Sequence, residues 1–191
     1  MPVMPPRPGQ VSEYGAMPYR IRKANRNDIP CLAKLLGEYM RETYQNAWGG
    51  TAQQLEEDVF GSKVNIVVAE AAKREVIAFV AWTFSYDLHH CLKGGEVIDL
   101  FVCSSHRGYG VALLLITNIA MRSRQNGGAY LKGGAVDNPT VHRLYQRIAM
   151  HVSGNDYYVS GRAFRRLAEL SGKSLREIAS NLPEKAWNYE P

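Results

Sequence analysis

The stretch from Glu96 to Ala112, which reads EVIDLFVCSSHRGYGVA, constrains the fold more than any other part of the sequence. It opens with the β-branched and apolar run Val97–Val102, which predicts a buried strand. Arg107-Gly108-Tyr109-Gly110 comes next, and the apolar run Val111–Ile116 then predicts a helix. Glycines let successive backbone N–H groups converge, and the helix N-terminus adds partial positive charge. Arg107 supplies a full charge with fork geometry for phosphate oxygens. We therefore predict a pyrophosphate-binding turn.

Two other phosphate-binding motifs fit the sequence less well: a dinucleotide-binding turn is weakly supported, and a nucleotide P-loop is rejected. A dinucleotide-binding turn needs a third glycine where Leu113 stands, and it needs an acidic residue at the end of a strand about 20 residues further on. Gly172-Lys173-Ser174 resembles a nucleotide P-loop only superficially, because Leu167 replaces the earlier glycine and no strand precedes it.

The rest of the chain reads as alternating strands and helices, which indicates an α/β fold in layers. Tyr19–Ala24 predicts an edge strand, and Asn27 or Asp28 can cap a helix that carries Pro30 in its first turn. The other predicted strands are 64–70, 76–84, 130–132 and a hairpin around 152–159, and the other helices are 51–60, one to about 124 and one starting at Asn138. The apolar runs 64–70 and 76–84 predict strands that are covered on both faces.

The composition divides the chain into three parts. Residues 1–18 hold five of the nine prolines and predict a disordered lead-in. Residues 19–160 form the main domain, and residues 161–191 predict a C-terminal helical extension of two short helices. The tail has the spacing of a helix-turn-helix, but its six basic and four acidic residues make a weak electrostatic footprint for DNA.

The bulk properties predict a cytoplasmic protein. The chain has 191 residues, a net charge of +5 and three cysteines without a C-x-x-C pair. No apolar run approaches the roughly 20 residues that cross a bilayer, so no membrane partner is expected. The dispersed positive charge favours an anionic small ligand over nucleic acid.

The pattern Arg107-x-x-Gly110-x-Ala112 after a strand resembles the acyl-CoA-binding signature of the GNAT superfamily of N-acetyltransferases. The stretch Cys31–Tyr39 resembles the first helix of that family. Tyr86-Asp87, the strand with Asp99, and Asn138 followed by Leu144-Tyr145 are similar to the spermidine/spermine acetyltransferase branch. The resemblance covers residues 19–160.

The resemblance implies a mixed, mostly antiparallel sheet that is splayed between its fourth and fifth strands, with helices on both faces and the C-terminal helical pair. It implies acetyl-CoA as the acyl donor, an amine acceptor, and we expect a homodimer. The backbone N–H of Val102 would bind the thioester carbonyl and later its oxyanion. The residues expected to line the CoA are Leu100, Phe101, Val102, Arg107, Gly108, Tyr109, Gly110, Val111, Ala112, Leu113 and Asn138.

Acetyl transfer to an amine also needs a base and an acid. An alkyl ammonium has a pKa near 10.4, so a protein group must accept its proton at neutral pH, directly or through water. The resemblance makes Tyr145 the acid that protonates the CoA thiolate. For the base, the polyamine branch carries a Glu-Asp pair; here Ile98 replaces the glutamate, which leaves Asp99, or Glu96 through a water.

Further acidic residues could bind the acceptor. Glu38, Glu42 and Asp87 could attract a cationic amine, and solvated surface charge explains them equally well. Met40 stands where the polyamine branch carries another glutamate. His89-His90-Cys91 lacks a spaced second pair of ligands, so we predict no metal. We expect Cys103 to be a core residue rather than a nucleophile.

We predict an N-acetyltransferase that transfers acetyl from acetyl-CoA to a primary amine of a small molecule, by direct attack in a ternary complex. One alternative is an acyl-CoA-binding regulatory or interaction module whose helical tail binds DNA or a partner. A second alternative is a protein or peptide N-acetyltransferase.

Overall fold

The computed structural model describes residues 19–60, 62, 64–134 and 180–181. The chain divides into two units, Met1–Val141 and His142–Pro191, and nearly all described residues lie in the first. The strands of that unit are β1 (Arg20–Lys23), β2 (Asn65–Glu70), β3 (Val76–Asp87), β4 (Leu92–Val102) and β5 (Tyr130–Gly133). The helices are α1 (Ile29–Tyr44), α2 (Ala52–Val59) and α3 (Val111–Gln125). The predicted lead-in, the helix from Asn138 and the 152–159 hairpin lie outside the described residues, and so does the C-terminal helical pair except for Ser180 and Asn181.

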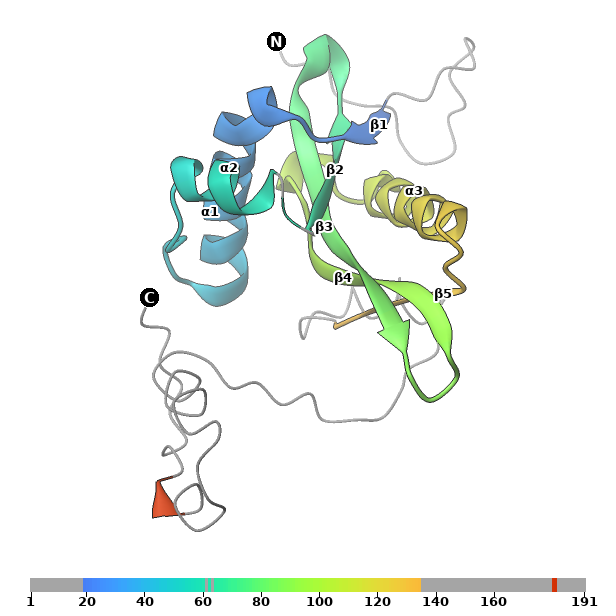
Figure 1. Ribbon diagram of the computed structural model, residues 1–191. Helices are drawn as coiled ribbons and strands as arrows, with labels where there is room; N and C mark the ends of the chain where they lie inside the picture. The colour runs from blue at the N-terminus through green and yellow to red at the C-terminus, as the bar shows by residue number, and fades with distance from the viewer. Residues whose placement is uncertain (1–18, 61, 63, 135–179, 182–191) are drawn as a thin grey trace, which may run out of the picture. The chain divides into compact units, whose positions relative to one another are not determined.

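The five strands form one sheet in the order β1-β2-β3-β4-β5 (Figure 1). Pairing is antiparallel from β1 to β4, and β5 joins β4 in parallel. The sheet is therefore mixed and mostly antiparallel, as predicted. The fourth and fifth strands pair only from Gly94 to Val97 on β4 and from Tyr130 to Gly133 on β5.

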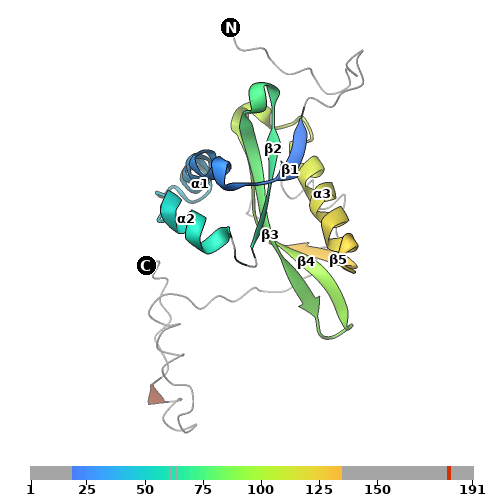
Figure 2. The same cartoon turned by 45° about the horizontal axis from the view of Figure 1, so that its top comes forward.

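Helices cover both faces of this sheet, which confirms the predicted layers (Figure 2). On one face α3 packs Leu115 and Ile119 against a core that includes Trp82. On the other face α1 packs Leu32 and Leu35 against a second core that includes Phe79, and α2 adds Leu55. The alternation of side chains along the strands sends successive residues to the two cores.

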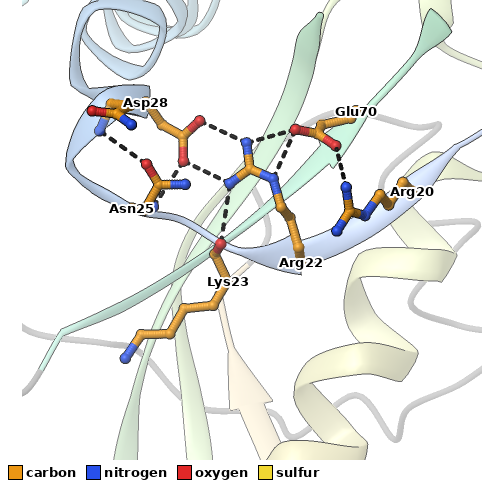
Figure 3. Close-up of polar contacts among 7 residues, drawn as sticks. Arg20, Arg22, Lys23, Asn25, Asp28 and Glu70 are labelled. Atoms are coloured by element: carbon orange, nitrogen blue, oxygen red, sulfur yellow. Dashed lines mark hydrogen bonds and ion pairs between the residues drawn. The ribbon is translucent and has the colours of Figure 1, made fainter. Parts of the chain in front are cut away.

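The corner between β1 and α1 is held by Arg22 (Figure 3). Its guanidinium donates to both carboxylate oxygens of Asp28 at 2.7 Å and to Oε1 of Glu70 at 2.7 Å. Both acids are buried, with 6% and 5% of their surface exposed. Asp28 precedes α1 as predicted, but its side chain makes no cap bond to the helix. The side-chain cap comes from Asn25, which accepts from the Asn27 N–H at 2.9 Å and caps a short 3₁₀ turn, Arg26–Asp28.

Strands β3 and β4 form a hairpin that is longer than predicted. The sequence indicated strands ending at Phe84 and starting at Val97, because the pair Gly94-Gly95 disfavours a strand. A Cβ at Gly94 would come within 2.4 Å of the Tyr130 ring. The glycines therefore let β5 pack closely on β4. The side chains of β3 are buried on both faces as far as Trp82, as predicted, whereas Phe84 is 50% exposed.

Candidate active site

The turn predicted to bind pyrophosphate connects β4 to α3. It leaves Val102 through a short 3₁₀ helix, Ser104–His106, and reaches the start of α3 at Val111. Gly108 and Gly110 have φ values of +82° and +79°, and a Cβ at either would meet no atom within 4 Å. The glycines are thus required by backbone conformation rather than by space. Gly110 is the N-cap and offers no side chain to the first helical N–H groups, which leaves them available to an anion.

The side chains that follow the glycines mostly turn inward. Val111 is 2% exposed and lies in the core under α3, and Tyr109 and Ala112 pack against the same core. Leu113 is 42% exposed. The backbone of this segment is therefore the part that can face a ligand, and binding of CoA by residues 108–113 stays a prediction.

The Arg107 side chain contacts residues of β4 and α1. Its Nε donates to the Val102 carbonyl at 2.8 Å, and its guanidinium forms an ion pair with Glu42 of α1. The Cζ atom lies 5.3 Å from the centre of the Phe101 ring. Arg107 therefore ties the turn to β4 and α1, and its predicted role toward phosphate requires exchange of the Glu42 contact.

Strand β4 carries a bulge next to this turn. Ala81 of β3 pairs with Asp99 and Trp82 pairs with Val97, so Ile98 is an extra residue on β4. Ile98 is 49% exposed. Beyond the bulge, β4 runs to Val102 without a strand partner on its β5 side among the described residues. The pairing of β4 with β5 among the described residues ends at Val97, next to this bulge.

The backbone of Val102 faces this open side. The Cys103 N–H donates to the Ile77 carbonyl of β3 at 3.0 Å. Because N–H groups alternate along a strand, those of Val102 and Leu100 point away from β3. The Val102 carbonyl accepts from Arg107 on that same side. In this position the Val102 N–H can donate a hydrogen bond to a thioester carbonyl, which is the role predicted for it.

Asp99 follows the bulge and faces α1. Its Oδ1 accepts a hydrogen bond of 2.8 Å from the Tyr39 hydroxyl. Burial raises the pKa of the Asp99 carboxyl, and the bond from Tyr39 acts in the opposite direction. A partly buried carboxylate with a raised pKa is better matched to accept a proton near neutral pH than a solvated one.

Tyr39 is the site residue that the sequence analysis did not identify. It is 8% exposed, and its ring packs edge-on against Phe79 and tilted against Phe101. Burial, a hydrogen bond with Tyr44 and the nearby Asp99 raise the pKa of the Tyr39 phenol. The sequence does contain one indication of this role: Tyr39 lies on the apolar face of a predicted helix, and a buried phenol usually has a hydrogen-bond partner.

The other acidic candidates are each paired with a cationic or donor group of this chain. Glu42 pairs with Arg107, and Glu96 lies 2.9 Å from Lys132 Nζ. Asp87 accepts from His90 at 2.8 Å and from the backbone of the hairpin turn. Glu38 lies 3.8 Å from Lys34 and accepts a weak bond from Cys103. Burial raises the pKa of the Cys103 thiol to about 11, so it stays protonated at neutral pH.

Two predicted residues, Asn138 and Tyr145, lie outside the described residues. Two surface hollows of about 320 and 130 Å³ lie along the ends of β1 and β2 and contain none of the candidate site residues. In the part of the chain that the structure describes, no helix is long and apolar enough to cross a membrane.

Several solved structures are similar to the fold described above. A ribosomal-protein-alanine N-acetyltransferase from Brucella melitensis biovar Abortus 2308 is 22% identical; the alignment covers 76% of this chain and 100% of that chain, with a TM-score of 0.63. An integron cassette protein from the mobile metagenome of V. cholerae is 22% identical over 81% of this chain and 99% of its own, with a TM-score of 0.67.

An aminoglycoside acetyltransferase from an uncultured soil metagenomic sample is 15% identical over 75% of this chain and 97% of its own, with a TM-score of 0.62. No curated protein matches this sequence significantly. A sequence model of the acetyltransferase (GNAT) family matches residues 31–150, which is more than half of the sequence. The chain therefore belongs to the GNAT family of acetyltransferases and is an acyl-CoA-dependent N-acyltransferase.

Proposed function

We propose that the chain transfers an acetyl group from acetyl-CoA to the primary amine of a small molecule, by direct attack in a ternary complex. The observation that supports the proposal is the bulged β4, where the partly buried Asp99 belongs to the stretch that has no strand partner on its β5 side among the described residues. The amide N–H groups of residues 108–113 bind the pyrophosphate at the start of α3. The N–H of Val102 holds the thioester carbonyl.

The reaction runs in one sequence of proton and bond changes. Asp99 accepts a proton from the ammonium, and the freed electron pair of the nitrogen attacks the thioester carbon. The oxygen that becomes negative is stabilised by the Val102 N–H. The C–S bond then breaks, Tyr145 donates a proton to the departing thiolate, and the nitrogen loses its second proton to water, which leaves a neutral amide. Asn138 completes the donor site.

The pairing of the acidic residues supports an acceptor with a single amine near the reaction centre. Glu38, Glu42, Asp87 and Glu96 each contact a basic or donor group of the chain. A polyamine would have to displace those contacts to place its second ammonium. Met40 also stands where the spermidine/spermine branch carries another glutamate, so turnover of monoamines against polyamines is the measurement that separates the two kinds of acceptor.

An acetyl-CoA turnover screen across monoamines, polyamines, aminoglycosides, amino acids and peptides tests the proposal, with release of the CoA thiol as readout. Asp99→Asn is expected to lower kcat by about 100-fold or more at an unchanged acetyl-CoA Kd. Its melting temperature should not fall, since burial disfavours the ionised carboxylate and the amide keeps an acceptor for Tyr39.

Glu96→Gln serves as the matched control and should change kcat little. A large loss in Glu96→Gln instead would assign the base to Glu96 through a water. Turnover confined to peptides would establish a peptide acceptor. Acetyl-CoA binding without turnover of any amine would overturn the proposal in favour of a binding module, whose tail at 161–191 would then be tested for DNA or partner binding.

We further propose that the enzyme acts as a homodimer in the cytoplasm, with the domain at 19–160 as its catalytic part. Analytical ultracentrifugation and cell fractionation measure the first two properties. Limited proteolysis followed by mass measurement locates the domain boundaries.

A further inference from the structure

The hydroxyl of Tyr39 is the polar end of an otherwise apolar contact. The ring lies among Phe79, Phe101 and Tyr44, with centroid separations between 5.8 and 6.5 Å. A phenylalanine would fill the same space, so ring packing does not explain the hydroxyl. The hydroxyl lies next to Tyr44 and donates to Asp99 Oδ1 of β4 at 2.8 Å.

The helix that carries Tyr39 is fixed at a second point of the same site. Glu42 lies three residues further along α1, on the neighbouring part of the helix surface. It forms the ion pair with Arg107, and Arg107 in turn binds the Val102 carbonyl. The same turn of α1 thus contacts Asp99, the candidate base, and the loop between β4 and α3 that is proposed to bind acetyl-CoA.

Asp99 has few other groups to hold it. Its pairing partner on β3 is Ala81, which carries no charge. From α1 it faces the Tyr39 phenol, behind which lies that of Tyr44. The nearest acid on its own strand is Glu96, which lies in the part of β4 that is paired with β5 and forms an ion pair with Lys132. Among the described residues Asp99 forms no ion pair.

We propose that Tyr39 is a positioning residue for the base: its hydroxyl holds Oδ1 of Asp99 so that Oδ2 takes the proton from the acceptor amine. This inference rests on the proposed function, in which Asp99 is the base. The step breaks one N–H bond and forms one O–H bond on Oδ2, and the electron pair stays on the nitrogen. Tyr39 keeps its own proton throughout, because burial and the adjacent Asp99 raise the pKa of its phenol.

The test is Tyr39→Phe, which removes the hydroxyl and keeps the ring. The titration of Asp99 is followed by carbon NMR of protein labelled at the aspartate carboxyls, with the signal assigned by its loss in Asp99→Asn. Loss of the donor should move the Asp99 titration upward by about one to two pH units, because a hydrogen bond to a charged group contributes that much.

The acidic limb of the kcat/KM profile should move upward by the same amount, with the acetyl-CoA KM unchanged. Activity should recover as the pH rises above the shifted limb. Tyr19→Phe is the matched control, since Tyr19 is 6% exposed and its hydroxyl binds His106 on the other face of the sheet. It should lower the melting temperature without moving either titration.

The outcomes separate the two proposals. An Asp99 titration in Tyr39→Phe that coincides with that of the unmodified protein would overturn the positioning role, whatever the base is. A shifted titration with an unmoved kcat/KM limb would overturn the catalytic part of the inference, and retained turnover in Asp99→Asn would then show that the base assignment itself had failed.

Discussion

Gly110 and Gly127 lie at opposite ends of α3 and share a φ of +79°. A Cβ at Gly110 would meet no atom within 4 Å, and a Cβ at Gly127 would only touch Lys93 at 3.8 Å. The two positions therefore impose the same backbone strain without a steric clash, about 1–2 kcal/mol for a residue with a Cβ. They differ in what surrounds them: Gly110 opens the N-terminus of α3, and Gly127 follows its C-terminus.

Gly110→Ala and Gly127→Ala are expected to lose similar amounts of stability. Only Gly110→Ala should also weaken acetyl-CoA binding, by tenfold or more, since its strain redirects the N–H groups at the helix start. Chemical unfolding and isothermal titration calorimetry with acetyl-CoA measure the two effects. Equal acetyl-CoA affinities in the two variants would contradict a donor site at this turn.

The sequence could predict this turn because its information is local. The strand, the glycines and the helix start occupy one continuous stretch, and each residue type has a direct backbone reason. The Tyr39–Asp99 bond joins residues 60 positions apart, and no local pattern encodes such a contact. The same applies to Glu42 and Arg107, which are 65 positions apart: their charges could be noted in the sequence, but their pairing could not.

At the scale of elements, Arg22 joins β1 to the start of α1 and to β2 (Figure 3). Arg22→Met keeps most of the apolar stem and removes the guanidinium. The buried carboxylate of Asp28 then loses its cation and that of Glu70 keeps only Arg20, at 3.8 Å, so we expect a loss of about 3–5 kcal/mol in the free energy of unfolding. Urea unfolding at pH 7 measures the loss.

Arg26→Met is the matched control, because Arg26 bonds Glu56 at the same 2.7 Å with side chains that are 66% and 42% exposed. It should cost less than about 1 kcal/mol. Similar losses in the two variants would show that the buried position of the Arg22 contacts contributes little.

The same pair of variants predicts a pH dependence. The Arg22 guanidinium holds the pKa of Asp28 below its usual value. The stability from that contact is fully present above the unfolded pKa near 3.9 and is lost as the pH falls below it. The difference between the unmodified protein and Arg22→Met should therefore shrink between pH 5 and pH 3. A difference that stays constant over this range would argue against an ionised Asp28 as its source.

The elements themselves were largely predictable from periodicity, and the misses have a common cause. The extension of β4 from Leu92 to Glu96 was missed because Gly94-Gly95 reads as a break. Those glycines are required by contacts with Tyr130 and Leu131 of β5, which are distant in sequence. The cap was assigned to Asn27 or Asp28 for a similar reason: the Asp28 side chain is drawn to Arg22 by the fold, and Asn25 takes the capping role.

At the scale of the whole sheet, the end of β4 has no strand partner on one side among the described residues, and this is where the acetyl-CoA site is proposed. Beyond Val97, β4 has no strand partner on the β5 side among the described residues, and the N–H groups of Leu100 and Val102 point there. The opposite end of the sheet is formed by the edge strand β1, whose pairing with β2 runs from Arg20 to Lys23. A donor that binds along β4 should therefore affect the two ends of the sheet differently.

Hydrogen exchange measured by mass spectrometry can detect this difference. Acetyl-CoA should slow exchange in peptides that cover residues 98–102 and 108–113, because the bound donor takes up N–H groups that otherwise exchange with water. Peptides from β1 and β2 should change little at times too short for global unfolding. Gly110→Ala at the same acetyl-CoA concentration should lose the protection in both segments, while Gly127→Ala should keep it. Equal slowing at β1 and β4 would instead indicate general stabilisation by mass action, with the donor bound elsewhere.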